Sequence, residues 1–142
     1  MFIAVRDIMT PNPITVQCSA MLVEVIGLMK AHKCRQLPVL EGHRLAGIVT
    51  DRDIRLAAHS SLVLREHSED LTFWQNATAQ DCMTYNPLTV EPNKPATHAA
   101  ELLNRYKFGA LPVVENGQLV GIVTVSDILS SYIALLAGQG SG

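Results

Sequence analysis

The chain has 142 residues, of which 48% are hydrophobic and 17% are charged, and its formal net charge at pH 7 is −2. This length and composition indicate one compact domain or two small, mutually dependent ones. The small net charge argues against a nucleic acid or an anionic membrane as partner. No apolar run reaches the roughly 18 residues of a membrane-spanning helix, and residues 1–7 lack the basic start and long apolar stretch of a signal peptide. We therefore expect a soluble cytoplasmic protein with neither nucleic-acid nor membrane partners.

One pattern of eight residues occurs twice and organises the chain. Residues 47–54 read GIVTDRDI and residues 121–128 read GIVTVSDI, and equivalent positions lie 74 residues apart (121 − 47 = 74). The same shift aligns residues 7–16 with residues 81–90 without a gap. A repeat maintained over this length predicts two copies of one structural unit.

The repeat divides the chain into four predicted segments. These are the first copy at 1–56, a linker at 57–78, the second copy at 79–136 and a flexible tail at 137–142. The linker contains the single tryptophan, Trp74. We interpret the linker as a connection with one hydrophobic anchor, and a partner-docking surface is the alternative.

Each copy predicts the same elements in the same order. The first copy predicts, in turn, a helical turn at 5–9, a strand at 14–16, a helix with its N-cap at Ser19, a hairpin over 37–49 and a closing helix that starts at Thr50. The second copy predicts the equivalents at 79–83, 88–90, Asn93, 111–123 and Thr124, with a tight turn at Asn116-Gly117. The fold class is therefore α+β, with a three-stranded mixed sheet and flanking helices in each copy. Because such a layer leaves one apolar face uncovered, the two copies are expected to pack together.

The second copy ends in an apolar helical segment. Residues 132–136 read YIALL, and an exposed helix end of this kind more often packs in an oligomer interface than faces water. We therefore expect a homodimer that forms through the closing helices.

The paired Thr and Asp of the repeated pattern have two interpretations. Thr50 with Asp53, and Thr124 with Asp127, fit a capping box, in which threonine and aspartate each accept a hydrogen bond from the other's backbone N–H. The same atoms suit a ribose-phosphate ligand, because a helix N-terminus favours phosphate and a carboxylate can accept hydrogen bonds from ribose hydroxyls. The glycine that opens each pattern is expected where two backbones come close.

Positive charge distinguishes the first copy from the second. Lys33, Arg35 and Arg52 of the first copy align with Lys107, Gly109 and Ser126 of the second. Positive charge close to a site attracts an anionic ligand. A phosphate-rich ligand is therefore expected to prefer the first copy, with Arg35 and Arg52 among its contacts.

In order and spacing, these motifs resemble a pair of cystathionine-β-synthase (CBS) domains, the regulatory unit known as a Bateman module. The resemblance rests on two copies of D-x-M-T-x-N-P-x-T-V, L-P-V and G-I-V-T-x-x-D-I, which together span nearly the whole chain. It implies that the copies pack about a pseudo-twofold axis and that clefts between them bind adenosine compounds such as AMP, ADP, ATP or S-adenosylmethionine. It implies no required cofactor.

The resemblance also implies which residues hold such a ligand. Asp53 and Asp127 would hold the ribose, and Thr50 and Thr124 would lie near phosphate. The adenine would lie against the first strand and the segment before the L-P-V strand. These segments supply Thr15, Val16, Gln36 and Leu37 in the first copy, and Thr89, Val90, Ala110 and Leu111 in the second. We call the two sets of residues the first site and the second site.

These inferences predict a stand-alone regulatory protein that binds an adenosine ligand between its repeats and signals to a regulated partner by a change of conformation. The alternative is a ligand-free, dimeric interaction or scaffold protein of the same fold, because capping and ligand binding require the same threonine and aspartate. An enzyme is not expected, since the five histidines and three cysteines show neither metal-ligand nor catalytic spacing. We accordingly assign no catalytic residue and no metal site.

Overall fold

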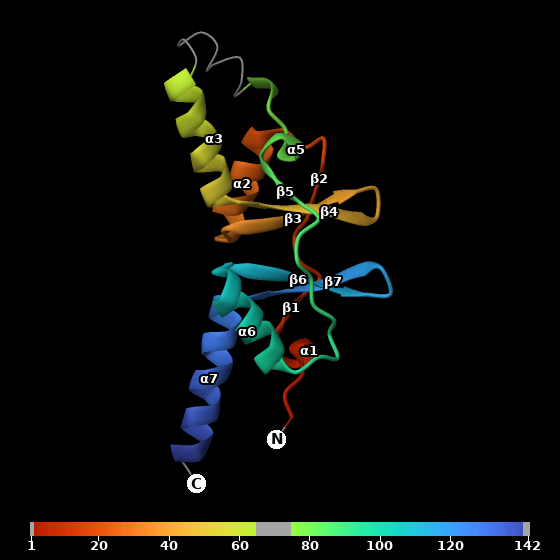
Figure 1. Ribbon diagram of the computed structural model, residues 1–142, viewed down its shortest axis with the longest axis vertical. Coiled ribbons are helices and arrows are strands. Elements are labelled where there is room, and N and C mark those ends of the chain that lie inside the picture. The colour runs from red at the N-terminus through yellow and green to blue at the C-terminus, as the bar shows by residue number, and fades with distance from the viewer. Residues whose placement is uncertain (1, 65–74, 141–142) are drawn as a thin grey trace. The chain divides into compact units, whose positions relative to one another are not determined.

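The computed structural model describes residues 2–64 and 75–140. Trp74 of the predicted linker lies outside the described residues, as do the last two residues of the predicted tail. The chain forms two compact units (Figure 1), and we call Ile14–Pro87 the continuous unit, and Met1–Pro13 together with Leu88–Gly142 the split unit. Each sequence copy therefore places its first segment in the unit that contains the rest of the other copy.

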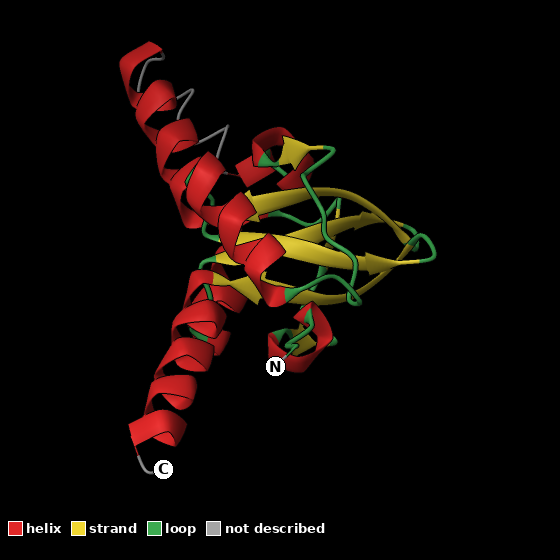
Figure 2. Cartoon of the chain, turned by 60° about the horizontal axis from the view of Figure 1, so that its bottom comes forward, coloured by secondary structure: helices red, strands yellow, loops and turns green. Residues whose placement is uncertain are grey.

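The continuous unit contains a four-stranded mixed sheet in the order β2-β3-β4-β5. Its strands are β2 (Val16–Gln17), β3 (Gln36–Glu41), β4 (Arg44–Thr50) and β5 (Thr84–Tyr85), and its helices are α2 (Leu22–His32), α3 (Asp51–Leu64) and α5 (Ala79–Cys82). β2 runs parallel to β3, whereas β4 is antiparallel to both of its neighbours. The order of the predicted strands and helices agrees with the structure. Figure 2 distinguishes the helices from the strands by colour.

The split unit repeats this arrangement with other parts of the chain. Its strands are β1 (Thr10–Pro11), β6 (Ala110–Glu115) and β7 (Gln118–Thr124), and its helices are α1 (Val5–Ile8), α6 (Ala96–Tyr106) and α7 (Val125–Gly140). β7 lies between β1 and β6 and is antiparallel to both. Val90 forms a parallel bridge to Val113, at the position where β2 pairs with β3 in the continuous unit. The predicted α+β class with a mixed sheet and flanking helices is confirmed.

The sheet of the split unit has the predicted three strands and that of the continuous unit has four, and each sheet receives one of its strands from the other copy. β5 belongs to the second copy and pairs with β4 of the first. β1 belongs to the first copy and pairs with β7 of the second. No strand was predicted at either of these segments, and the repeated pattern does not reveal an exchange between copies.

Gly47 and Gly121 explain how the exchanged strands fit. A Cβ atom on Gly47 would lie 2.6 Å from Met83 Sδ and 2.6 Å from the carbonyl oxygen of Thr84. A Cβ atom on Gly121 would lie 2.5 Å from Met9 Sδ and 2.9 Å from the carbonyl oxygen of Thr10. These separations are shorter than any normal van der Waals contact, so the exchanged backbone requires glycine at both positions. The predicted close approach of two backbones is confirmed.

Each unit has its own hydrophobic core, and each core combines residues of both copies. The core of the continuous unit joins buried residues of α2, β3 and β4 with Ala77 from the predicted linker and Ala79 from the second copy. The core of the split unit places Val5 of α1 beside Leu111 of β6 and Val123 of β7. Full burial of a valine or leucine side chain contributes roughly 1.5–3 kcal/mol. Neither copy therefore completes its core alone.

The helices α2 and α6 begin later than predicted. The expected N-caps, Ser19 and Asn93, lie outside these helices, and neither helix has a side-chain cap. The first N–H of α2 instead donates to the carbonyl oxygen of Ala77 at 2.9 Å, and the first N–H of α6 donates to that of Ile3 at 2.7 Å. Main-chain acceptors on the exchanged segments replace the side-chain caps, because a helix N–H needs only one acceptor.

The tight turn between β6 and β7 agrees with the prediction. Asn116 has a φ angle of 53° and Gly117 one of 77°, and two positive φ angles are the requirement of a type I′ turn. The turn sets the register in which Glu115 pairs with Gln118. Asn116 and Gly117 are therefore enough to predict the turn of this hairpin.

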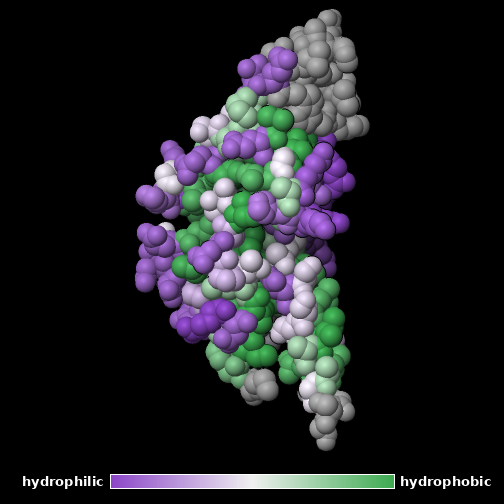
Figure 3. Space-filling model, turned by 180° about the vertical axis from the view of Figure 1, so that it is seen from behind, coloured by the Kyte–Doolittle hydropathy of each residue, from purple (hydrophilic) through white to green (hydrophobic). Residues whose placement is uncertain are grey.

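The closing helices α3 and α7 continue directly from β4 and β7, as predicted. Hydrophobic atoms follow the surface of α7 (Figure 3). On this helix, four large side chains are at least 48% exposed, namely Leu129, Tyr132, Ile133 and Leu136. In the described part of the chain, no helix combines the length and the apolar character needed to span a membrane.

Candidate functional site

The repeated Thr-x-x-Asp lies where the last strand of each hairpin enters a helix. In the first site, the N–H of Asp53 donates to Thr50 Oγ1 at 3.0 Å, and the N–H of Thr50 donates to Asp53 Oδ2 at 3.1 Å. The corresponding distances between Asp127 and Thr124 are 3.1 Å and 2.9 Å. The predicted capping box is confirmed in both units, and each cap contributes about 1 kcal/mol.

The capping box leaves one oxygen of each aspartate available. Oδ2 of Asp53 and of Asp127 accepts the threonine N–H, whereas Oδ1 accepts no hydrogen bond from any described residue. Both residues are half-buried, so each carboxylate is held in position and still reached by solvent. An ionised carboxylate accepts several hydrogen bonds, so the second oxygen can receive a ligand hydroxyl. The two interpretations of the motif, helix cap and ligand contact, are therefore compatible.

The segment before the L-P-V strand lies beside this junction. Gln36 pairs with Thr50 across β3 and β4, and Ala110 pairs with Thr124 across β6 and β7. The first N–H of α3 donates to the carbonyl oxygen of Arg35 at 2.8 Å, and the first N–H of α7 makes the equivalent bond at 3.1 Å. The structure thus brings these two predicted segments together in each unit.

Several predicted adenine contacts are buried. Five of them are at most 8% exposed, namely Val16, Leu37, Val90, Ala110 and Leu111. These fractions include the main chain, so the structure leaves little surface at these five positions for a ligand to contact. Thr15 is half-buried and Thr89 is exposed, so both side chains remain accessible.

The first site carries positive charge that is available to a ligand. Arg35 and Arg52 are exposed, and neither forms an ion pair with a residue that the structure describes. On the same helix, Asp51 pairs with Arg55 at 3.9 Å, so within the described part of the chain Arg52 is the cation of this turn that has no carboxylate partner. The second site has uncharged residues at the positions equivalent to Arg35 and Arg52.

Two cavities of the split unit border the second site. Asp127 lines a groove of about 890 Å³ together with Asp7 and Ile8 of α1. Thr89 lines a separate polar cavity of about 370 Å³ at the hairpin end, together with Glu91. Thr89 and Asp127 therefore face different cavities. The sequence prediction missed Asp7 and Ile8 because the exchange of α1 has no local signal, and it missed Glu91 because this residue lies just outside the repeated motifs.

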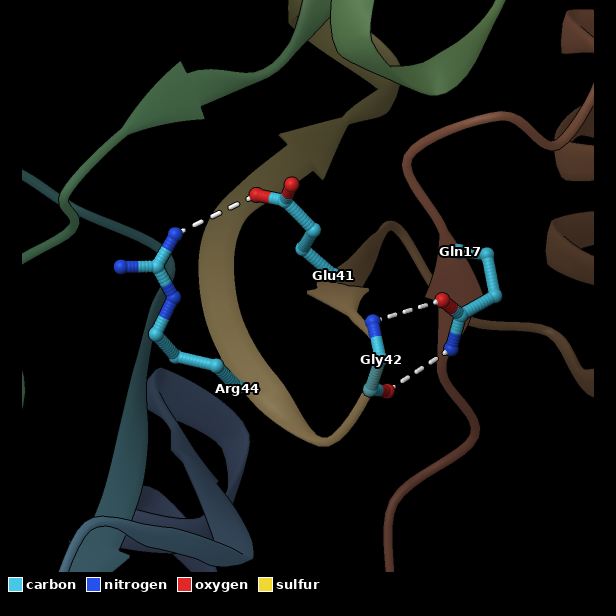
Figure 4. A network of polar contacts seen from close by, with 4 residues as sticks. All are labelled: Gln17, Glu41, Gly42 and Arg44. Atoms are coloured by element: carbon cyan, nitrogen blue, oxygen red, sulfur yellow. Dashed lines mark hydrogen bonds and ion pairs between the residues drawn. The ribbon is translucent and has the colours of Figure 1, made fainter.

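Gln17 holds the end of β2 against the hairpin of the continuous unit. Its Nε2 donates to the carbonyl oxygen of Gly42 at 3.1 Å, and its Oε1 accepts from the N–H of Gly42 at 3.0 Å (Figure 4). Beside this clamp, Arg44 donates to Glu41 at 3.2 Å. The equivalent of Gln17 in the split unit is Glu91, whose carboxylate has no N–H to donate. The sequence prediction missed Gln17, since an exposed glutamine carries no motif.

Two of the thiols of the continuous unit, those of Cys34 and Cys82, are poorly suited to reaction. Burial raises the pKa of Cys34 and of Cys82, and the nearby carboxylates of Asp81 and Asp53 raise the pKa of Cys82 further. A raised pKa lowers the fraction of thiolate, which is the reactive form. Among the residues that the structure describes, no group of three His, Cys, Asp or Glu side chains is arranged to hold a metal ion.

Known proteins match both copies of the repeat. The family model of the CBS domain matches residues 5–60 and 79–134. A CBS domain-containing protein of Dictyostelium discoideum is 32% identical over 138 residues, which cover 96% of this chain and 95% of that protein. The match therefore extends over nearly the full length of both proteins.

Two solved structures share the fold. CBSX2 of Arabidopsis thaliana in complex with AMP has a TM-score of 0.78 and 30% identity, and the match covers 93% of this chain and 97% of that chain. The CBS domain pair of protein MJ0100, in complex with 5′-methylthioadenosine and S-adenosyl-L-methionine, has a TM-score of 0.76 and 27% identity, with 98% and 99% covered. With the family model on both copies and the fold shared with these pairs, the chain belongs to the CBS domain family and contains a pair of CBS domains.

Proposed function

We propose that this CBS pair is a regulatory protein that binds an adenosine ligand at its Thr-x-x-Asp sites. The observation that carries the proposal is the available Oδ1 of Asp53 and Asp127, on carboxylates that the capping bonds hold at a helix start. Two structural relatives were solved with adenosine compounds, one with AMP and one with 5′-methylthioadenosine and S-adenosyl-L-methionine. Ribose hydroxyls that donate to the aspartates would be common to all these ligands.

The ligand of the first site is a nucleotide, AMP, ADP or ATP. The helix start at Thr50 favours a negative group by roughly 0.3–1 kcal/mol. Arg35 and Arg52, which pair with no carboxylate among the described residues, supply two cations in the same unit. Charge-assisted hydrogen bonds from arginine to phosphate are among the strong polar contacts of proteins. The first site therefore has both the ribose contact and the charge that a nucleotide requires.

Ligand binding acts on a regulated partner protein by shifting populations. A ligand that binds one conformation more tightly moves the chain toward that conformation. This change of conformation alters the surface that contacts the partner protein. In this proposal the chain carries no catalytic residue and responds to ligand concentration alone.

The functional form is a homodimer joined through α7. Its exposed leucines, tyrosine and isoleucine form an apolar face, and the sequence after Asp127 contains no charged residue. A twofold interface places the same surface on both sides, and an uncharged face meets its own copy without like-charge repulsion. Light scattering is expected to give about 31 kDa, twice the chain mass of 15.5 kDa. Ile133→Glu should give the monomer, and a wild-type mass near 15.5 kDa at micromolar concentration contradicts the dimer.

Titration calorimetry and thermal unfolding with AMP, ADP and ATP test ligand binding. At about 100 times its dissociation constant, a ligand raises the free energy of unfolding by roughly 2.7 kcal/mol. Asp53→Asn is expected to lose most of this gain in unfolding free energy. Each variant is compared with its own ligand-free form, so that the stability lost with the helix cap does not enter the comparison. Glu24→Gln removes a carboxylate from the exposed face of α2 in the same unit and should keep the gain.

The second candidate is a ligand-free scaffold of the same fold. It is favoured by one observation, that both capping boxes are complete without a ligand. If no adenosine compound changes the unfolding of the wild-type chain, the scaffold function stands. If the gain survives both Asp53→Asn and Asp127→Asn, a ligand binds at residues other than those proposed.

A further inference from the structure

We propose that the split unit binds a small organic carboxylate with an apolar body, in a pocket between α6 and α7. These two helices contact each other within the split unit (Figure 1). The pocket between them has a volume of about 360 Å³, within the roughly 300–1,000 Å³ of small-molecule sites. We call it the α6–α7 pocket, and its apolar lining residues are Ala100, Leu103, Phe108, Val125 and Ile128.

The α6–α7 pocket is separate from the carboxylate of the second site. Val125 lines the pocket, whereas Asp127 lines the groove beside α1. Residues two positions apart in an α-helix point about 200° apart, toward nearly opposite sides. The pocket therefore excludes the ribose contact proposed above, and this proposal does not depend on the binding of an adenosine compound.

One cation and one neutral amide complete the lining of the pocket. Lys107 Nζ donates to Asn104 Oδ1 at 3.3 Å, and Lys107 forms no ion pair with a residue that the structure describes. The amide oxygen positions the ammonium without neutralising its charge, and two of its three N–H donors remain for a ligand. Because the described lining contains neither aspartate nor glutamate, the pocket favours an anionic group.

The apolar part of the pocket is incompletely covered by the protein. Phe108 and Val125 are each 43% exposed. The Phe108 ring stacks on Tyr106, with ring centroids 5.6 Å apart and an interplanar angle of 18°, so the ring forms a wall of fixed orientation. A ligand whose body covers Phe108 and Val125 removes apolar surface from water. The lining therefore favours an anion with an apolar body over a small, fully hydrated anion.

The single ammonium selects a carboxylate rather than a phosphate. A carboxylate carries one negative charge, which one lysine balances. A phosphate monoester carries about 1.5 to 2 negative charges at pH 7, so part of its charge would lie uncompensated against apolar side chains. The ligand class that fits the pocket is therefore a monocarboxylate with an aromatic or branched apolar body.

The continuous unit shows that the fold does not require this lining. At the positions equivalent to Phe108 and Val125, 74 residues earlier, it has Cys34 and Asp51. Asp51 would oppose an anion, and Cys34 provides no aromatic wall. The lysine is kept at Lys33. Since the same fold forms with a thiol and a carboxylate at these positions, the exposed phenylalanine and valine of the split unit are available for a ligand of its own.

NMR titration of the full chain tests the proposal, with phenylacetate, phenylacetamide and acetate as separate probes. Phenylacetate has both the charge and the apolar body, whereas phenylacetamide lacks the charge and acetate lacks the body. Phenylacetate is expected to bind at least about tenfold more tightly than either of the others. Its binding should shift the backbone amide resonances of Phe108 and Val125.

Removal of the ammonium tests the contact with the carboxylate. Lys107→Met keeps a long side chain and should lower the affinity for phenylacetate by about tenfold, while the affinity for phenylacetamide stays the same. Lys94→Met is the matched control, because Lys94 is an exposed lysine of the same unit outside the pocket lining. This control should bind phenylacetate as the wild-type chain does.

A residue of the continuous unit provides a second variant that the fold accepts. Val125→Asp installs the side chain of Asp51 at the equivalent position and should lower the affinity for phenylacetate by at least about tenfold, because two carboxylates then meet in the pocket. Thr97→Asp adds the same charge at an exposed position of α6, seven residues before Asn104 and so about 10 Å away along the helix. Salt screens a charge at this distance, so the affinity should not change.

Three outcomes overturn the proposal. The first is that phenylacetate does not bind, or shifts resonances outside the α6–α7 pocket. The second is equal affinity for phenylacetate and phenylacetamide, or an affinity for phenylacetate that Lys107→Met and Val125→Asp leave unchanged. The third is binding that appears only in the monomeric variant Ile133→Glu, because a second copy of the chain would then occupy the pocket. Selective loss of phenylacetate binding in Lys107→Met and Val125→Asp, with both controls unchanged, supports the proposal.

Discussion

The continuous unit and the split unit use the same packing and different charges. Gly47 and Gly121 each meet the sulfur and carbonyl oxygen of an exchanged Met-Thr pair at nearly the same distances. By contrast, Gln17 clamps its hairpin, whereas Glu91 at the equivalent position lines a cavity. Buried contacts restrict which side chain fits, while exposed charges leave the fold unchanged. One fold can therefore contain two sites that suit different ligands.

The largest expected difference in stability is between a fragment that contains one structural unit and a fragment that contains one sequence copy. Residues 14–87 contain all the strands of the four-stranded sheet, so this fragment is expected to unfold cooperatively. Residues 1–56 lack β5 and the core residues Ala77, Ala79 and Met83, so this fragment is expected to be unfolded. Circular dichroism in urea distinguishes the two. A cooperative transition in the fragment 1–56 would show that the exchanged strand is dispensable.

Substitution of the two glycines tests whether both units depend equally on the exchange. Gly47→Ala and Gly121→Ala each place a Cβ within 3 Å of a carbonyl oxygen, so each should lower the free energy of unfolding by about 1–3 kcal/mol or more. Gly27→Ala in α2 is the matched control, because nothing lies within 4 Å of its Cβ. It should raise stability by roughly 0.5–1 kcal/mol. Urea titrations measure the free energy of unfolding of all three variants. If only one of Gly47→Ala and Gly121→Ala kept the wild-type stability, the two units would differ in this constraint.

Removal of the clamp should affect one unit only. Gln17→Ala removes two hydrogen bonds to Gly42 and is expected to lower the free energy of unfolding by about 0.5–1.5 kcal/mol. Glu91→Ala removes no hydrogen bond among the described residues, and we expect a change close to zero. Equilibrium unfolding in urea measures the free energy of unfolding of the two variants under the same conditions. Equal losses would mean that Glu91 stabilises its own hairpin as Gln17 does.

The smallest expected effect is a pH dependence confined to the continuous unit, which contains all three cysteines. The pKa values of Cys34 and Cys82 are raised in the folded state, so the folded chain holds these protons more tightly than the unfolded chain. The resulting stability is present below the ordinary thiol pKa of 9.0 and is lost as pH rises through the raised values.

Thermal unfolding from neutral pH to above the ordinary thiol pKa measures this loss. The control is the double variant Cys34→Ser with Cys82→Ser, in which the decline in melting temperature should be shallower than in the wild-type chain. Superimposable pH profiles of the two proteins would show that these thiols do not contribute.

The candidate site was predictable where its contacts are local. Thr50 and Asp53 bond to each other three residues apart, so the motif alone contains both partners. The burial of Leu37 was not predictable, because an apolar residue early in a strand has the same pattern whether it faces a core or a ligand. Asp7 and Glu91 were missed because a cavity depends on neighbours that no motif names.

The sequence by itself determined the order of the elements, the two capping boxes and the turn at Asn116-Gly117. Each depends on residues within a few positions of one another, where backbone geometry and hydrogen bonding act locally. Only the tertiary structure decided which copy completes which sheet and where α2 begins. The N–H that starts α2 finds its acceptor at Ala77, 55 residues further along the chain (77 − 22 = 55), and packing rather than any local pattern brings the two together.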